Sequence, residues 1–77
     1  MDWTDKGFVL SARRYGENSL IVNVLTSEQG RHGGLVRGGA SARNRGLYQP
    51  GNYLRVQWRG RLLEHLGSFK CELIYSH

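Results

Sequence analysis

Residues 53–59 are YLRVQWR, and this stretch decides the fold class of the chain. Its apolar side chains, at positions 54, 56 and 58, alternate with polar ones at 55, 57 and 59. Successive side chains of a β-strand point to opposite faces. The alternation therefore predicts a strand with one buried face and one face in water.

The same period of two recurs on both sides of this strand. It is present in residues 8–12, 20–25 and 69–73, and a shorter apolar stretch lies at Leu35 and Val36. Glycine and proline turns separate these stretches, at Gly16, at residues 27–30, at Pro50-Gly51, and at Gly60 and Gly67. The pattern predicts five strands, with residues 40–49 as the longest irregular segment and a helical turn within it.

Five strands in 77 residues predict an all-β fold with a single domain over residues 1–77. So few strands must curl to avoid two exposed edges. A five-stranded Greek-key barrel is the OB-fold, and residues 40–49 stand where a connector between its third and fourth strands is expected. An SH3-like barrel is the alternative that the strand count leaves open. Glycines in and beside the third strand indicate a bulge, a bend or the close approach of a ligand: Gly33, Gly34, Gly38 and Gly39.

The charge balance points to a polyanionic partner. The chain has 11 Lys and Arg residues against 6 Asp and Glu, a formal net charge of +5, and every basic residue except Lys6 and Lys70 is an arginine. The planar guanidinium grips phosphate with two hydrogen bonds and stacks on bases, which an ammonium cannot do. The alternative is a basic surface that serves solubility alone.

No constellation of residues predicts catalysis, a metal or a cofactor. His32, His65 and His77 have no cysteine or carboxylate at ligand spacing. Cys71 is the only cysteine, lies on the apolar face of its strand, and is expected in the core. We therefore expect a protein that is not an enzyme.

Cellular location is predicted from the same residues. A single cysteine suits a reducing cytoplasm. The N-terminus is acidic and polar where a secretory signal would be basic and then apolar, and no apolar stretch is long enough to span a membrane. We expect a cytoplasmic protein.

The arginines are grouped, and the groups predict a nucleic-acid site. One group ends the third strand and enters the connector, a second follows the polar face of the fourth strand into the next turn, and a third ends the first strand beside Tyr15. In an OB barrel, the second and third strands and their loops form the usual groove for nucleic acid. Tyr15 and Tyr48 are the candidates for stacking on bases, whereas Trp58 and Phe69 are expected in the core. The predicted site residues are Arg37, Arg43, Arg45, Arg55, Arg59, Arg61, Arg13, Arg14 and Tyr48.

An ordered set of short motifs also resembles one family. These motifs are Val9-Leu10 with Arg13-Arg14, the turn Gly16-Glu17-Asn18-Ser19, the hairpin residues Thr26, Glu28, Gly30 and Arg31, the pair Arg37-Gly38, and the turn Tyr48-Gln49-Pro50-Gly51. Together they resemble the N-terminus of RecO, a family of bacterial recombination mediators in DNA repair.

The resemblance implies an OB domain that binds DNA, mainly single strands and also duplex. It further implies strand annealing, loading of recombinase onto gaps coated with single-strand-binding protein, and RecR as a partner. DNA contact carries over most directly to Arg37, Arg43 and Arg45, although Ala40 and Ala42 stand where relatives often have basic residues. RecO proteins continue into a helical domain, so the chain is expected to be an N-terminal piece, monomeric alone. Two alternatives remain: a module that docks RecR or another protein, and an RNA-binding OB domain.

Overall fold

The computed structural model describes residues 2–41, 44, 46–61 and 66–76. Five strands and one short helix fill this part of the chain, and they confirm the predicted all-β fold with a helical turn between the third and fourth strands. The elements are β1 (Asp2–Tyr15), β2 (Ser19–Thr26), β3 (Arg31–Val36), the 3₁₀ helix η1 (Gly46–Tyr48), β4 (Tyr53–Arg59) and β5 (Ser68–Tyr75). No helix in these described ranges is long and apolar enough to cross a membrane.

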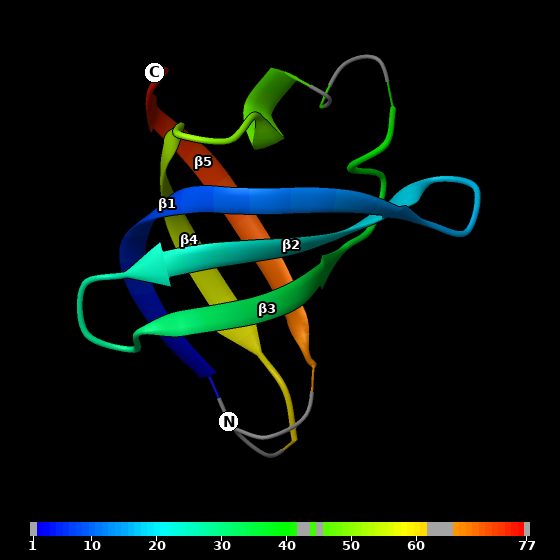
Figure 1. Ribbon diagram of the computed structural model, residues 1–77. Coiled ribbons are helices and arrows are strands. Elements are labelled where there is room, and N and C mark those ends of the chain that lie inside the picture. Colours follow the sequence, from blue (N-terminus) through cyan, green and yellow to red (C-terminus); the bar gives the residue numbers. More distant parts are fainter. Residues whose placement is uncertain (1, 42–43, 45, 62–65, 77) are drawn as a thin grey trace.

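The strands form one closed barrel in the order β1-β2-β3-β5-β4 (Figure 1). The long strand β1 pairs with β4 through its first half and with β2 through its second half, and a bulge between Val9 and Ser11 bends it between the two. All neighbours are antiparallel except β3 and β5, which meet through the single parallel pair Leu35 and Ser68. Five strands closed in this order are consistent with an OB-type barrel.

The alternation in residues 53–59 places three fully buried side chains in the barrel. Leu54 and Val56 are 0% exposed and Trp58 is 1% exposed. The indole nitrogen of Trp58 donates a hydrogen bond to the carbonyl of Leu66 at 2.9 Å. Phe69, at 6% exposure, completes the predicted pair of core aromatics.

The first strand is longer than the alternation in residues 8–12 predicts, because it begins at Asp2. Its early residues bring Trp3 into the barrel, where the two indole rings of Trp3 and Trp58 stack 5.8 Å apart. His32 packs edge-on against both rings, at 5.1 Å and 4.9 Å. This aromatic cluster closes one end of the core.

Candidate nucleic-acid interface

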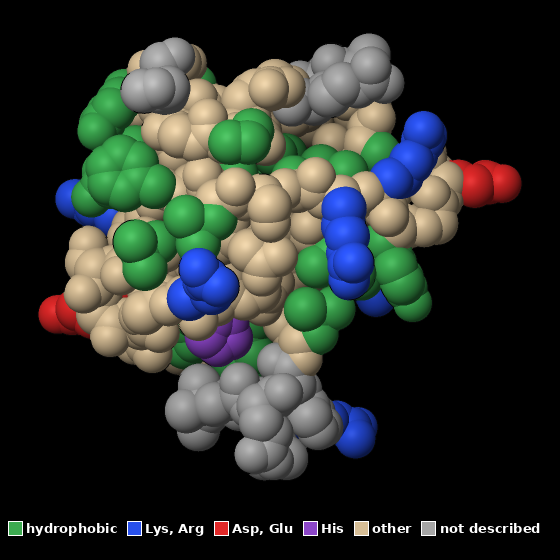
Figure 2. Space-filling model, viewed as in Figure 1, with side chains coloured by type: hydrophobic (Ala, Val, Ile, Leu, Met, Phe, Trp, Pro, Cys, Tyr) green, Lys and Arg blue, Asp and Glu red, His purple; other side chains and the backbone are tan. Residues whose placement is uncertain are grey.

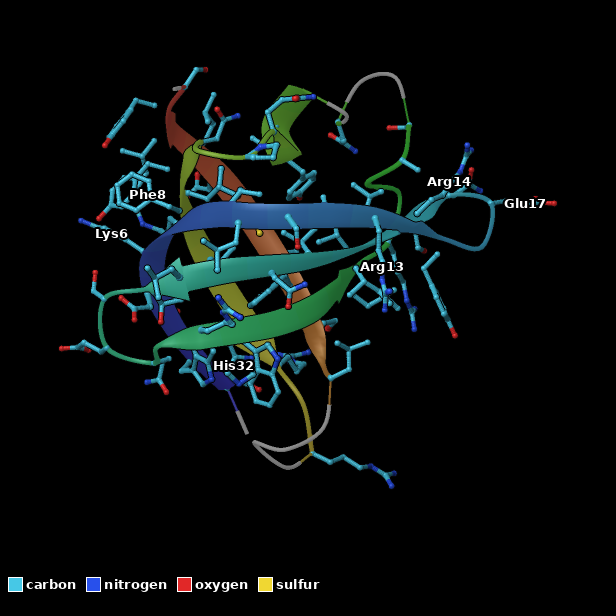
Figure 3. All side chains as sticks on the ribbon, in the orientation of Figure 1. Lys6, Phe8, Arg13, Arg14, Glu17 and His32 are labelled. Carbon is cyan, nitrogen blue, oxygen red and sulfur yellow. The ribbon has the colours of Figure 1, made fainter. Side chains whose placement is uncertain are left out.

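The structure divides the predicted arginines between two walls of the barrel. Arg13 and Arg14 lie at the end of β1, where they pair with Ile21 and Leu20 of β2. Arg37 directly follows β3, whose last residue also pairs with Leu20. Figure 3 shows Arg13 reaching from the end of β1 over the start of β2, while Arg14 lies by the hairpin tip near Glu17. Arg13 and Arg37 therefore lie on the outer side of this wall, whereas Arg14 belongs to the row of Leu20 and the buried Val36 and points to the other side of β1.

A fourth arginine on this wall was not among the predicted site residues. Arg31 begins β3, is exposed, and pairs with Leu25 of β2. The sequence could have indicated Arg31. It lies four positions before Leu35, and side chains an even number of positions apart share one face of a strand. We call Arg13, Arg31 and Arg37 the arginine face. Arg37 is six positions after Arg31, and at about 3.3 Å per position the face has a length of about 20 Å.

The arginine face carries unneutralised charge. In the described part of the chain, no carboxylate lies within 4.0 Å of Arg13, Arg31 or Arg37. Arg14 donates a hydrogen bond to the backbone carbonyl of Glu17 at 3.1 Å, which holds it across the β1–β2 turn without cancelling its charge. Figure 2 shows basic side chains spread over this side of the molecule, with acidic ones only at the two lateral edges.

The arginines of β4 lie on the other wall, and both have acidic partners. Arg55 forms an ion pair with Glu72 of β5 at 2.9 Å. Arg59 lies 3.5 Å from the carboxylate of Asp2. Paired charges of this kind attract phosphate less than free ones, so β4 is the weaker candidate surface.

Tyr48 is largely buried, although it lines part of the depression described below. Its side chain is buried, with 6% of the residue exposed. Burial raises the pKa of its hydroxyl, and the neighbouring Cys71 raises it further. This burial disfavours stacking on a base, and the role of Tyr48 stays a prediction. Tyr15, 58% exposed beside Arg14, keeps its place as a candidate.

Three further predicted residues lie in loops. Arg61 is exposed in the connection between β4 and β5. Arg43 and Arg45 lie outside the described residues, and their contribution to the site stays a prediction.

A broad depression of about 760 Å³ extends from Arg37 along β5. Arg37 and Asn44 line one part of it, and Arg59 and Lys70 line another. Asp2 is its one described acidic residue. Cations thus outnumber carboxylates among its charged residues, and the depression adjoins the arginine face at Arg37.

Glycine at position 33 makes room for neighbouring side chains in the middle of the arginine face. A Cβ atom built there would lie 2.9 Å from Oδ1 of Asn23, on the outer side of β2 and β3, and 3.6 Å from Cδ1 of Leu66. The Asn23 amide therefore lies over this position of β3. Among the described residues, no three His, Cys, Asp or Glu side chains are grouped to hold a metal ion.

Comparison with known proteins gives the family. The family model described as "Recombination protein O N terminal" matches residues 1–77. The "DNA repair protein RecO" of Bradyrhizobium diazoefficiens is 58% identical over 72 residues, which are 94% of this chain and 29% of that protein. The protein of the same name from Nitrobacter hamburgensis is 58% identical over 72 residues, 94% of this chain and 28% of its own length. That of Rhodopseudomonas palustris is 56% identical over the same length, 94% of this chain and 29% of its own.

The chain thus spans less than a third of the length of these curated relatives. Their shared name refers to DNA repair and states no catalytic activity. The family model covers every residue of the chain, and the motifs that resemble RecO lie throughout it. This chain belongs to the RecO family and corresponds to its N-terminal domain.

Proposed function

We propose that this domain binds DNA in repair, mainly as single strands, by gripping phosphates with the arginine face. The observation that carries the proposal is the set of three arginines, Arg13, Arg31 and Arg37, with no carboxylate within ion-pair distance in the described chain. Free guanidinium groups on one wall are suited to a chain of phosphates. The names of the relatives supply the repair context.

The size and shape of the face support binding without base readout. Its length of about 20 Å suits the 4–16 nucleotides that one OB domain typically covers. Arg31 and Arg37, at its two ends, reach the phosphates with guanidinium groups. Phosphate contacts hold the strand but carry no sequence information.

A single strand is favoured because stacking needs an unpaired base. Tyr15 is the exposed ring nearest to Arg13 and Arg14 along the chain. The described wall has no helix to enter a major groove, so duplex would be held by its phosphates alone. Strand annealing, recombinase loading, and contacts with RecR and single-strand-binding protein in the cytoplasm belong to the proposal at the level of the longer family protein. The arginine face accounts only for the DNA contact.

The experiment compares two double variants that remove equal charge. R13A with R37A alters the arginine face, and R55A with R59A alters β4; each pair lowers the formal net charge of +5 by two. Binding of a fluorescent single-stranded oligonucleotide is measured by anisotropy at low salt. We expect the first pair to weaken binding by about tenfold or more, from loss of two charge-assisted contacts, and the second to weaken it much less.

Equal losses in the two pairs would show that net charge alone drives binding, and no binding by the wild type would refute the proposal. Competition with RNA of the same sequence tests the RNA-binding alternative. Preference for RNA would reassign the ligand, because the 2′-hydroxyl is the feature that distinguishes the two polymers.

A further inference from the structure

Two polar side chains bond to each other in the middle of the arginine face. Asn23 of β2 pairs with Ser11 of β1 on one side and with Gly33 of β3 on the other. The side-chain amide of Asn23 donates a hydrogen bond to the hydroxyl oxygen of Ser11 at 3.2 Å. We call Ser11 and Asn23 the polar pair. The three strands that carry this row lie side by side in Figure 1.

The polar pair has an arginine on each side of it. The next outward row in one direction along the strands contains Arg13, and the next outward row in the other direction contains Arg31. Outward rows are two positions apart, which is about 7 Å along a strand. A chain of phosphates that is held by both Arg13 and Arg31 therefore passes over Asn23.

Asn23 and Gly33 are unusual residues for the middle of a sheet. Asparagine and glycine are both depleted in strands, and the other residues of β2 are mostly aliphatic. Positions that contradict the preference of their own element are expected at functional sites. The two exceptions fit each other, because a Cβ atom at Gly33 would lie 2.9 Å from Oδ1 of Asn23. Glycine thus lets the amide lie across β3.

The polar pair has hydrogen-bonding groups to spare. In the described part of the chain, Oδ1 of Asn23 accepts no hydrogen bond, and the hydroxyl of Ser11 donates none. The amide nitrogen carries two hydrogens, and its bond to Ser11 uses one of them. The pair therefore presents an acceptor next to donors. This combination matches the edge of an unpaired base, where donors and acceptors also stand side by side.

Apolar side chains on the same outer face give a base a surface to lie on. Ile21 and Leu35 are half-buried and pair with each other in the row of Arg13. Leu66 is 45% exposed, and its Cδ1 would lie 3.6 Å from a Cβ atom at Gly33. Bases pack their flat faces on apolar side chains while their edges form hydrogen bonds.

We propose that the polar pair binds the edges of unpaired bases and so makes the domain prefer single-stranded DNA to duplex. This inference rests on the proposed function, because the arginine face must first hold the phosphates. In a duplex the Watson–Crick edges are already paired, so the polar pair gains nothing from them. In a single strand every base offers donors and acceptors on that edge, so the preference is for unpaired bases and not for one kind of base.

An oligonucleotide without bases tests the proposal. Binding by anisotropy at low salt is compared for a fluorescent single strand and for an abasic strand with the same number of phosphates. S11A with N23A removes the polar pair, and T4A with Q57A removes a hydroxyl and an amide that pair across β1 and β4. Both double variants keep the formal net charge of +5.

The polar pair is expected to matter only when bases are present. S11A with N23A should bind the intact strand about fivefold more weakly than the wild type, from the loss of one or two hydrogen bonds. The same variant should bind the abasic strand as the wild type does. T4A with Q57A should bind both strands normally.

Two results would overturn the proposal. One is an equal loss for the intact and abasic strands in S11A with N23A, because the effect would then act through the fold or the phosphates. The other is no loss for the intact strand; if R13A with R37A still weakens binding, the arginine face stands and only the polar pair is refuted. Failure of the wild type to bind the intact strand refutes both.

The variant N23V separates binding from stability. Valine is favoured in strands, so the free energy of unfolding in urea should be unchanged or higher than that of the wild type. The affinity for the intact single strand should nevertheless fall by about fivefold, and the affinity for a duplex of the same length by less than twofold. A stable N23V that binds the single strand normally would assign Asn23 to the sheet alone and contradict the proposal.

Discussion

Two adjacent glycines of β3 show how closely single residues fit this barrel. A Cβ atom at Gly34 would lie 2.7 Å from the ring of Phe69, inside the core. One at Gly33 would meet the ends of the Asn23 and Leu66 side chains, on the outer wall. The sequence alone offered a bulge, a bend or ligand approach for both. The structure assigns Gly34 to packing in the core and Gly33 to contact with flexible side-chain ends outside it.

Alanine at the two positions is expected to have different effects. G34A should lower the free energy of unfolding by about 1–3 kcal/mol, because the Phe69 ring must move in a packed core. G33A should cost less stability, because the flexible Asn23 amide can turn away. Urea denaturation of both variants checks this. Equal stability losses would contradict the assignment.

Asp5 holds the β2–β3 hairpin from the neighbouring strand. Its carboxylate accepts hydrogen bonds from the backbone N–H groups of Glu28 at 2.7 Å and Gln29 at 3.2 Å, and from that of Lys6 at 2.7 Å. Burial raises the pKa of this carboxyl, but the three backbone donors outweigh it and the net pKa is lowered from 3.8. The stabilisation is therefore present above about pH 4 and is lost as the pH falls through the lowered pKa.

The variant D5N is expected to lose about 1–2 kcal/mol of stability at pH 7, because a neutral amide accepts these bonds more weakly. The loss should shrink as the wild type is protonated below about pH 4. Thermal unfolding of both proteins between acidic and neutral pH measures the effect, with E17Q at the exposed hairpin tip as the control. A difference that stays constant across this range would contradict the role of the charge.

At the scale of elements, the helical turn η1 is held inward by the residue that precedes β4. The side-chain amide of Asn52 donates hydrogen bonds to the carbonyls of Gly46 and Leu47, at 3.0 Å and 3.1 Å. This clamp turns Tyr48 into the core against Cys71. The sequence predicted the turn but not which way Tyr48 points. Tyr48 stands between arginines and a proline, in a segment without alternation, so no pattern separates a buried side from an exposed one.

Packing beside η1 is expected to protect Cys71 from alkylation. Burial raises the pKa of its thiol to about 11, although the Tyr48 hydroxyl opposes the shift by hydrogen bonding. At pH 8 about one thiol in a thousand would then be ionised, and the thiolate is the reactive form. Iodoacetamide should react with the folded chain at least about a hundredfold more slowly than with the chain in urea. In Y48A the rate should rise; equal rates in folded and unfolded wild type would contradict this packing.

For the whole molecule, salt dependence reports how many arginines contact DNA together. If Arg14 and Arg61 join the three residues of the arginine face, five contacts to a single strand predict a slope of log K against log salt of about −3.5. The variant R13A with R37A should make the slope shallower by about 1.4. Anisotropy titrations at several salt concentrations measure both slopes. A slope unchanged by the double variant would exclude these two arginines from the contact.

The sequence determined more of the fold than of the site, for a physical reason. Alternation within one strand, as at Leu54 and Trp58, separates the buried face from the wet one and so predicts the core. A surface site depends instead on which strands become neighbours. Arg55 pairs with Glu72, 17 positions later in the chain, and Phe8 contacts Tyr53, 45 positions later. These contacts depend on the register between strands, which no local sequence pattern predicts. From the sequence, the arginines of β4 were therefore as good candidates for phosphate contact as those of β1 and β3. Only the structure shows that Arg55 and Arg59 have acidic partners.

The single parallel pair between Leu35 and Ser68 has a consequence for how the barrel opens. The bond from the N–H of Leu35 to the carbonyl of Gly67, at 3.0 Å, belongs to this junction of one residue pair, whereas every other neighbouring pair has an extended ladder. With so few paired residues, this junction should open locally more often than the other strand pairs. Amide exchange should therefore be fastest there among the paired strands.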